Sequence, residues 1–297
     1  MLAPLNSNSA QRRFQVQRFT QSSTAKNPSP PPPQEGFTAT QPDLSGFARF
    51  PKDKILAVRD TKLDDDGDRV LLLDPKSSSM KSVPIDWSKT GRSRDLEAVA
   101  PGPKPGEFLA VEGSSWGEHK ARLFELKVGD DGGTAEKAHV LPEFGQEIEG
   151  LVSLDRGEGR QTLLFAGRGG DGKEPKIYWG DLTPDGLKFE PKGLEGKAVQ
   201  APFLAEGQRG LAELTADDKG QLWAAVTIDE GDTGPFQSSV YQVGSLTPND
   251  ETPFRSRSGK NFSVPGIKAE ALTFTSQGTL FVGSDDELLG GRVGFFS

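Results

Sequence analysis

The stretch Ile148-Glu149-Gly150-Leu151-Val152-Ser153-Leu154 decides the fold, together with the apolar run Thr162-Leu163-Leu164-Phe165-Ala166 that follows it. A turn with an acidic residue leads into one apolar strand, and a second apolar strand follows after a short polar gap. A similar arrangement starts at four other places in the chain, with Ser45 and Arg209 in place of the acid in two of them: Leu44-Ser45-Gly46-Phe47, Leu96-Glu97-Ala98-Val99, Gln208-Arg209-Gly210-Leu211 and Ala269-Glu270-Ala271-Leu272. The phrase is therefore a repeat unit with five copies.

The spacing of the five phrases indicates the architecture. Their second positions are 52, 52, 60 and 61 residues apart (45 to 97, 97 to 149, 149 to 209 and 209 to 270). Repeats of roughly 40 to 60 residues with several short strands are typical of β-propeller blades, because one four-stranded sheet cannot bury both faces without neighbours. We predict an all-β fold, a single five-bladed β-propeller over residues 36–297. A six-bladed propeller is the alternative, since the longer fourth repeat leaves residues 193–205 loosely assigned.

Composition narrows the classes of protein. The 297 residues include 36 Gly and 22 Pro, which suits many short strands joined by turns. No apolar run approaches the 18 residues of a membrane span, so none is expected. Cysteine is absent, which excludes disulfides and thiolate metal sites, and two histidines are too few for a histidine-based metal cluster. The net charge of −8 argues against nucleic acid as the main partner.

The N-terminal 35 residues differ from the rest. Residues 1–34 contain Arg12, Arg13, Arg18 and Lys26 and no acid, and they end in the proline run 30–33. We predict a disordered tail and Pro-rich linker over residues 1–35, with an organelle transit peptide as the alternative. No secretory signal is visible, and the compartment stays open, an extracytoplasmic location included if a leader has been removed.

The fifth copy of the repeat is one strand short. Propellers commonly complete their last blade with a strand from the other terminus, which removes an exposed sheet edge. Two segments before the first blade could supply this strand. We therefore predict that residues 14–19 or residues 36–40 close the ring.

Three short motifs match chemical signatures formally, but their contexts favour other interpretations. Asp64-Asp65-Asp66-Gly67-Asp68 is more typical of a hairpin turn than of a calcium loop, because no helices flank it. Gly113-Ser114-Ser115-Trp116-Gly117 matches a nucleophile elbow, yet a strand is expected at 122–126 where that motif needs a helix. The glycine-rich run 167–172 also precedes an expected strand, so it lacks the helix N-terminus that binds a pyrophosphate.

Charged residues recur where blades begin. The first strand of a propeller blade lines the central channel, so four side chains should converge on the axis: Glu97, Glu149, Arg209 and Glu270. The ends of the second strands add a further layer: Arg59, Asp60, Glu112, Arg168, Asp229, Glu230, Asp285 and Asp286. Converging carboxylates need a counter-charge, so they should bind a hard cation, pair with the arginines or hold protons. The alternative is structural, with each glutamate bonded to the backbone of the neighbouring blade.

We predict metal ligands at Glu97, Glu149 and Glu270, with Ca²⁺ as the candidate ion. The predicted ligand-binding residues form the layer around them: Arg59, Glu112, Arg168, Arg209, Asp229 and Asp285. Carboxylates with arginines could hold calcium and a phosphate ester together, the metal polarising phosphorus and the arginines binding oxygens. No catalytic residue is assigned.

The phrases Asp95-Leu96-Glu97-Ala98-Val99, Ile148-Glu149-Gly150-Leu151 and Ala269-Glu270-Ala271-Leu272 resemble those of bacterial SdiA-regulated and phytase-like propeller proteins. A related uncharacterised bacterial domain family has phrases similar to Asp43-Leu44-Ser45-Gly46 and Leu164-Phe165-Ala166-Gly167-Arg168-Gly169. The resemblance covers about residues 42–290. It implies a propeller, often with calcium in or near the channel, and sometimes esterase or phosphatase-like activity. Ser45 and Arg209 depart from the acidic pattern and weaken the inference of an enzyme.

The sequence is compatible with two candidate functions for this protein. The first is a phytase-like or SdiA-regulated-like propeller that binds a metal ion or a small anionic ligand in the axial funnel, with hydrolysis of a phosphoester or ester as the reaction. The second is a non-catalytic propeller that serves as a scaffold for a protein partner, its channel charges being structural. A funnel with an ion site favours the first, and fully satisfied salt bridges favour the second.

Overall fold

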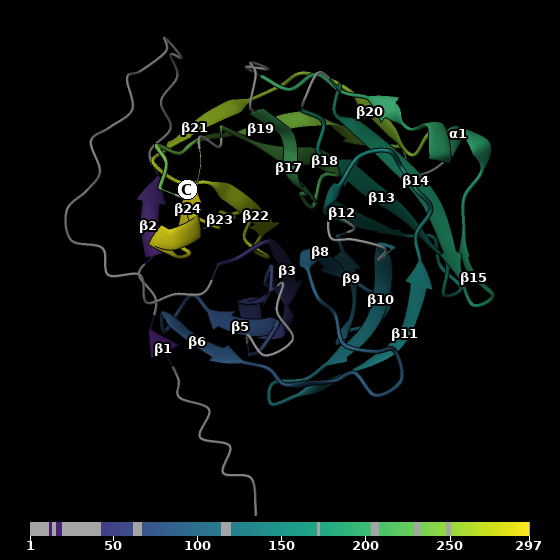
Figure 1. The fold of residues 1–297 in the computed structure, drawn as a ribbon, viewed down its shortest axis with the longest axis horizontal. Coiled ribbons are helices and arrows are strands. Elements are labelled where there is room, and N and C mark those ends of the chain that lie inside the picture. The colour runs from purple at the N-terminus through teal and green to yellow at the C-terminus, as the bar shows by residue number, and fades with distance from the viewer. Residues whose placement is uncertain are drawn as a thin grey trace, which may run out of the picture.

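The computed structural model describes residues 12–13, 16–19, 43–61, 67–113, 120–170, 173–202, 208–228, 231, 233–247 and 251–296. These residues form five sheets placed around a central axis, as Figure 1 shows. The prediction of an all-β, five-bladed propeller is confirmed, and the six-bladed alternative is wrong. None of the helices in these ranges is long and apolar enough to cross a membrane.

Each blade takes its inner strand from one copy of the repeat. The first blade holds β3 (Gly46–Phe50), β4 (Lys54–Val58), β5 (Val70–Asp74) and β6 (Ser79–Ser82), with the turn η1 (Pro51–Asp53) between β3 and β4. The second holds β8 (Leu96–Pro101), β9 (Glu107–Glu112), β10 (Arg122–Val128), β11 (Gly133–Val140) and the outer β7 (Ile85–Asp86). The third holds β12 (Ile148–Asp155), β13 (Gln161–Gly167), β14 (Lys176–Thr183), β15 (Gly186–Lys188) and β16 (Lys197–Ala198).

The last two blades follow the same plan. The fourth holds β17 (Gln208–Ala216), β18 (Gln221–Ile228), β19 (Gln237–Leu246), β20 (Phe254–Ser256) and β21 (Asn261–Pro265). The fifth holds β22 (Ala269–Phe274), β23 (Leu280–Ser284), β24 (Val293–Phe296) and β2 (Val16–Phe19). The turn η2 (Glu287–Leu289) joins β23 to β24. Neighbouring inner strands contact one another in the cyclic order β3, β8, β12, β17, β22, so they surround the axis.

Extra outer elements explain the longer repeats. The short helix α1 (Pro191–Glu195) and β16 lie between the third and fourth blades in the sequence, and β16 pairs with β14. In the fourth blade, β20 and β21 both pair with β19. The additional residues therefore widen blades at their outer edges and do not build a sixth.

The apolar core is divided among the five interfaces between blades. Each apolar cluster draws buried residues from two adjacent blades, as when Leu56 and Val58 pack with Val99 and Phe124. A further cluster joins the fifth blade to the first through Phe281 and Phe47 and closes the ring. Because both faces of a blade are covered, central strands such as β13 are buried over their whole length.

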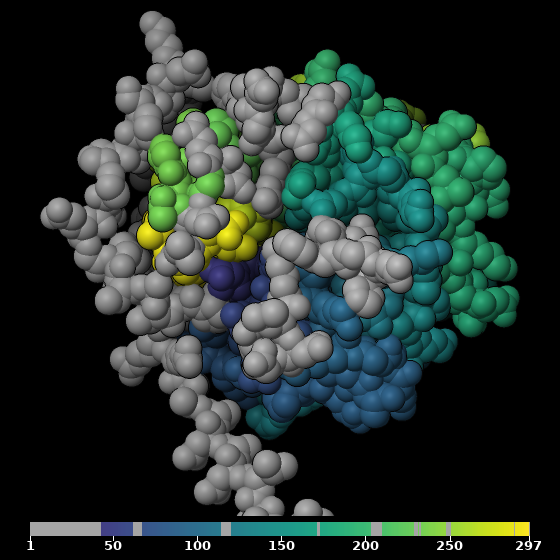
Figure 2. Space-filling view, viewed as in Figure 1, coloured from purple at the N-terminus to yellow at the C-terminus, as the bar shows by residue number. Residues whose placement is uncertain are grey.

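The N-terminal segment spans the seam of the ring. β2 pairs in parallel with β24, and β1 (Arg12–Arg13) pairs with β6 of the first blade. Figure 1 shows β1 and β2 beside these two edges, and Figure 2 shows the first and last blades side by side. The prediction that an N-terminal strand closes the propeller is confirmed for Val16–Phe19. The two residues of β1 and the four of β2 lay within the predicted tail. Residues 14–15 and 36–40 lie outside the described ranges.

Candidate functional site

The repeated glutamate occupies a β-bulge. Leu96 and Ala98 pair with consecutive residues of β9, so Glu97 between them is the extra residue. The same shift occurs around Glu149 in β12 and around Glu270 in β22. A bulge re-aims a side chain and commonly lies next to functional sites.

Close packing of the inner strands explains the small residue at the third position of the repeat phrase, which is Gly46, Ala98, Gly150, Gly210 or Ala271. A Cβ atom on Gly150 would lie 2.5 Å from the backbone nitrogen of Leu214. At Gly46, a Cβ atom would lie 2.8 Å from the Cα atom of Ala98. Larger residues here would push the inner strands apart, so the Glu-Gly and Glu-Ala pairs reflect the geometry of the channel.

Three carboxylates converge between the first two blades. Asp60 follows β4, Asp95 precedes β8, and Glu97 lies in β8. One carboxylate oxygen from each lies within 4.8 Å of the others, and we call these residues the acidic triad. The backbone holds two of them, because the amide of Asp60 donates to Ser45 Oγ (2.9 Å) and the amide of Gly113 donates to the carbonyl of Asp95 (2.8 Å).

The environment of Glu97 is acidic. Burial raises the pKa of Glu97 well above its ordinary value, and the carboxylates of Glu149, Asp95, Asp60 and Glu270 raise the pKa further. Glu97 as a whole residue keeps partial solvent exposure. A cation there would relieve the repulsion.

The triad fits a hard divalent cation. Calcium takes carboxylate oxygens at about 2.3–2.6 Å, so oxygens about 5 Å apart or less can share one ion. The three donors meet this limit and are all oxygen. Of the predicted metal ligands, the structure places Glu97 in this group and Glu149 and Glu270 in ion pairs with cationic side chains.

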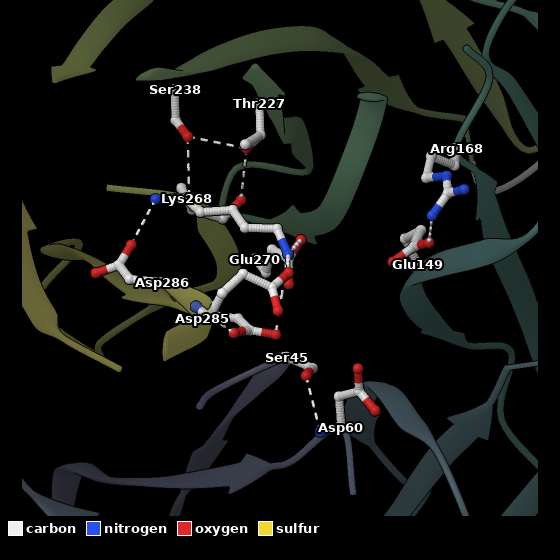
Figure 3. Close-up of polar contacts among 12 residues, drawn as sticks. Ser45, Asp60, Glu149, Arg168, Thr227, Ser238, Lys268, Glu270, Asp285 and Asp286 are labelled. Carbon is white, nitrogen blue, oxygen red and sulfur yellow. Dashed lines mark hydrogen bonds and ion pairs between the residues drawn. The ribbon is translucent and has the colours of Figure 1, made fainter. Parts of the chain in front are cut away.

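A buried lysine provides a positive charge for the carboxylates of the fifth blade. Lys268 directly precedes β22, and its Nζ atom lies 3.3 Å from Glu270 Oε1 and 4.0 Å from Asp285 Oδ2 and contacts Glu287 Oε1. We call these four residues the lysine cluster. Figure 3 shows the lysine side chain reaching toward Glu270 and Asp285. Burial raises the pKa of Asp285, and Lys268 acts against that rise.

The third blade supplies an arginine. Arg168 Nη1 lies 3.2 Å from Glu149 Oε1, and its Nη2 lies 2.7 Å from Glu147 Oε2. The carbonyl of Arg168 accepts from the amides of Gly210 and Leu211 in β17. Arg168 therefore fixes the position of Glu149 and connects the third blade to the fourth. Figure 3 shows Arg168 and Glu149 at the right, away from Lys268.

Sequence reasoning missed the buried carboxylate of the fourth blade. The register of β17 skips from Arg209 to Glu213, because three residues bulge out of the ladder. Glu213 is buried, and the amides of Leu214 and Leu151 hydrogen-bond its carboxylate. Burial raises the pKa of Glu213 well above its ordinary value, and Glu149 and Glu270 raise it further. The signal that could have found it is one acid inside the apolar strand 211–214.

Sequence reasoning also missed Asp43, which lies just before the first blade. Burial raises the pKa of Asp43 to about 7, with Asp285 adding to the rise and Arg59 opposing it. Arg59 Nη1 also donates to the carbonyl of Asp68 at 3.2 Å. Asp286 is fully buried and accepts from Arg292 Nε at 2.5 Å. The first and fifth blades thus contribute acids to one region.

Other predicted site residues lie elsewhere or outside the described ranges. Glu112 is buried and holds Arg122 through two contacts of 2.5 and 3.0 Å, besides accepting from the amide of Arg94. The backbone of Arg209 pairs with Thr227, while its side chain is not described. The following residues lie outside the described ranges: Asp64 to Asp66, Ser114 to His119, Asp171, Gly172, Asp229 and Glu230.

Comparisons with known proteins support the fold. No family model matches the chain, and no curated protein matches it in sequence. A thermostable family-43 glycoside hydrolase is similar over 88% of this chain and 92% of its own, with 13% identity and a TM-score of 0.51. An endo-arabinase from Bacteroides thetaiotaomicron VPI-5482 is similar over 88% and 96%, with 12% identity and a TM-score of 0.50. These likenesses show a propeller fold and carry no activity over to this chain.

Proposed function

We propose that the protein is a propeller of the phytase-like or SdiA-regulated type that binds a divalent cation, Ca²⁺, at the acidic triad. The convergence of Asp60, Asp95 and Glu97 carries this proposal. Three carboxylates give the oxygen donors and the charge that calcium prefers, and channel water can complete the coordination. Glu97 lies at the bulge in β8, where a side chain can be re-aimed, and its carboxylate lies within 4.8 Å of those of the other two acids.

The remaining charges favour an anionic ligand bound next to the cation. A channel this acidic repels anions, and a bound cation would reduce the negative potential and so strengthen anion binding. When bound, the cation would polarise a phosphoryl or carbonyl oxygen of the ligand. Arg168 and Lys268 supply positive side chains from the third and fifth blades. Hydrolysis of a phosphoester or ester is the reaction class that this arrangement would serve.

A scaffold for a protein partner is the second candidate, and one observation favours it. Glu112, Glu149 and Glu270 each contact a cationic side chain of the same chain. Such pairs can serve packing alone, without a ligand. The two candidates differ in whether the channel binds a cation.

Calorimetric titration of the metal-stripped protein with Ca²⁺ tests the proposal. The expected result is a saturable heat in the wild type that Glu97→Gln and Asp95→Asn abolish. Glu158→Gln is the matched control, because Glu158 is exposed and pairs only with the exposed Arg160 at 3.7 Å among its described contacts. No heat in the wild type, or equal heat in Glu97→Gln, would reject the cation site and leave the scaffold.

A further inference from the structure

The three carboxylates around Lys268 are not equivalent. The side chain of Lys268 is 2% exposed, and those of Glu270 and Asp285 are 5% and 7% exposed. The side chain of Glu287 is 34% exposed, although its carboxylate contacts the same Nζ atom. Two of the counter-charges are therefore fixed within the protein, and the third reaches the lysine from the solvent side.

The backbone around Glu287 is strained. Glu287 has a φ of 52°, in the left-handed region that residues with a side chain rarely adopt. It begins the three-residue turn η2, and its amide donates to Asp285 Oδ1 at 3.0 Å. Such strain persists where surrounding contacts enforce it and is concentrated at functional sites. In this turn, the contact with Lys268 is one of those contacts.

We propose that the carboxylate of Glu287 occupies an anion subsite at Lys268, from which the carboxylate group of a small ligand displaces it. The proposal rests on the proposed function in one respect, that the channel takes an anionic ligand. Beyond that function, the anion would bind at Lys268, would carry a carboxylate group and would compete with Glu287.

Charge balance favours such an exchange. A buried lysine cannot lose a counter-charge cheaply, and replacement of one carboxylate by another keeps the balance. Glu270 and Asp285 are enclosed by protein, whereas the side chain of Glu287 already borders solvent, so of the three it needs the smallest rearrangement to leave the lysine. A dianion would add charge beside two fixed carboxylates, so a monoanionic carboxylate group matches the subsite better than a phosphate.

Competition within the chain lowers the apparent affinity for a ligand. The wild type binds a ligand only in the fraction of molecules whose Glu287 has left the lysine. The apparent dissociation constant therefore equals the intrinsic one divided by this fraction. In Glu287→Ala the subsite is open, so a carboxylate such as acetate should bind about tenfold more tightly or better. Acetate should also restore thermal stability to this variant, because a ligand that binds the folded state stabilises it.

Thermal unfolding in sodium acetate against sodium chloride of equal ionic strength tests the proposal. We expect a saturable acetate-specific rise in Tm for Glu287→Ala, a smaller rise for the wild type, and none for the double variant Lys268→Met, Glu287→Ala. Glu251→Ala is the matched control, since Glu251 pairs with the exposed Lys192 at 3.1 Å. Equal acetate effects in all four proteins, or none in Glu287→Ala, would overturn the subsite.

Calcium titration of Glu287→Ala separates this proposal from the cation site. Calcium binding without acetate rescue would reject the subsite alone. Acetate rescue without calcium binding would reject the cation site and keep the subsite.

Discussion

The acidic triad and the lysine cluster use the same repeated glutamate in different ways. Glu270 and Glu97 occupy equivalent bulges in β22 and β8. Glu270 meets the ammonium of Lys268 at 3.3 Å, a cation that belongs to the fold. The leading charges acting on Glu97 are all carboxylates, and they raise its pKa. The fifth blade therefore carries its own cation, while the triad is suited to an exchangeable one.

This difference shows what a repeat can and cannot encode. The repeat places a carboxylate at the start of an inner strand. The residues outside it, such as Lys268 and Asp60, decide whether that carboxylate is neutralised by the chain or binds an ion. Loss of the lysine should therefore lower the stability of the lysine cluster, whereas changes at the triad should mainly affect calcium binding.

Removal of the lysine should have the largest effect. Lys268→Met leaves Glu270 and Asp285 buried without their cation, and loss of one partner of a buried pair costs about 3–5 kcal/mol. Urea unfolding of the variant should show this loss in the free energy of unfolding. Lys192→Met removes an exposed partner of Glu251 and should change stability by about 0.5 kcal/mol or less. A loss below about 1 kcal/mol for Lys268→Met would contradict the role of the lysine.

Stability should fall as pH rises in the metal-free protein. The folded-state pKa values of Asp43, Glu97 and Glu213 are raised, so above their ordinary pKa values the folded state holds protons that the unfolded chain has released. The pKa of Asp43 rises from 3.8 to about 7, which sets a window between these two values. Urea unfolding at pH 5 and pH 8 should show the decline.

The variant Asp43→Asn should remove part of this decline. The pKa shift of Asp43 corresponds to about 4 kcal/mol for an enclosed group, and solvent screening of its exposed part reduces this to about 2 kcal/mol. Asp86→Asn is the control, because hydrogen bonds from Ser88 lower the pKa of Asp86. An unchanged slope in Asp43→Asn would show that Asp43 is not a source of the decline.

A methyl group beside the triad should weaken calcium binding. A Cβ atom on Gly113 would lie 3.0 Å from Glu97 Oε1 and 3.2 Å from Asp95 Oδ2, so both carboxylates must move. Gly113→Ala should lower calcium affinity about tenfold in calorimetry, as changes behind metal ligands do. Gly129→Ala is the control, since its nearest atom would lie 3.5 Å away. Full affinity in Gly113→Ala would place the ion elsewhere.

The smallest effect is expected at Ser45. Ser45→Ala removes the acceptor for the amide of Asp60, and loss of such a hydrogen bond costs about 1 kcal/mol. Chemical denaturation measures the change, with the exposed Ser77→Ala as control. Equal stabilities of Ser45→Ala and the wild type would mean that the amide of Asp60 finds another partner.

Much of the fold was predictable because it depends on local repetition. Five phrases with regular spacing predicted five blades, and the missing fifth-blade strand predicted closure by residues 14–19 or 36–40, of which Val16–Phe19 pair with the last blade. The bulges in β8, β12 and β22 coincide with Glu97, Glu149 and Glu270 because the phrase itself encodes the bulge.

The site was predicted only in part because it joins residues from different blades. Lys268 precedes the fifth phrase and has no counterpart in the other copies, so repetition gave no reason to select it. In the fourth blade the repeat position is Arg209, and the buried acid is Glu213, on the far side of the wider bulge of β17. Packing between blades determines which acids meet, and a single repeat cannot show that.

We expect the triad, and not the other repeated glutamates, to hold the cation. A crystal structure of the protein grown with Mn²⁺, with data collected at a wavelength where manganese scatters anomalously, tests this claim most directly. We expect one anomalous peak within bonding distance of Asp60, Asp95 and Glu97. A peak against Glu149 or Glu270, or no peak in the channel, would contradict it.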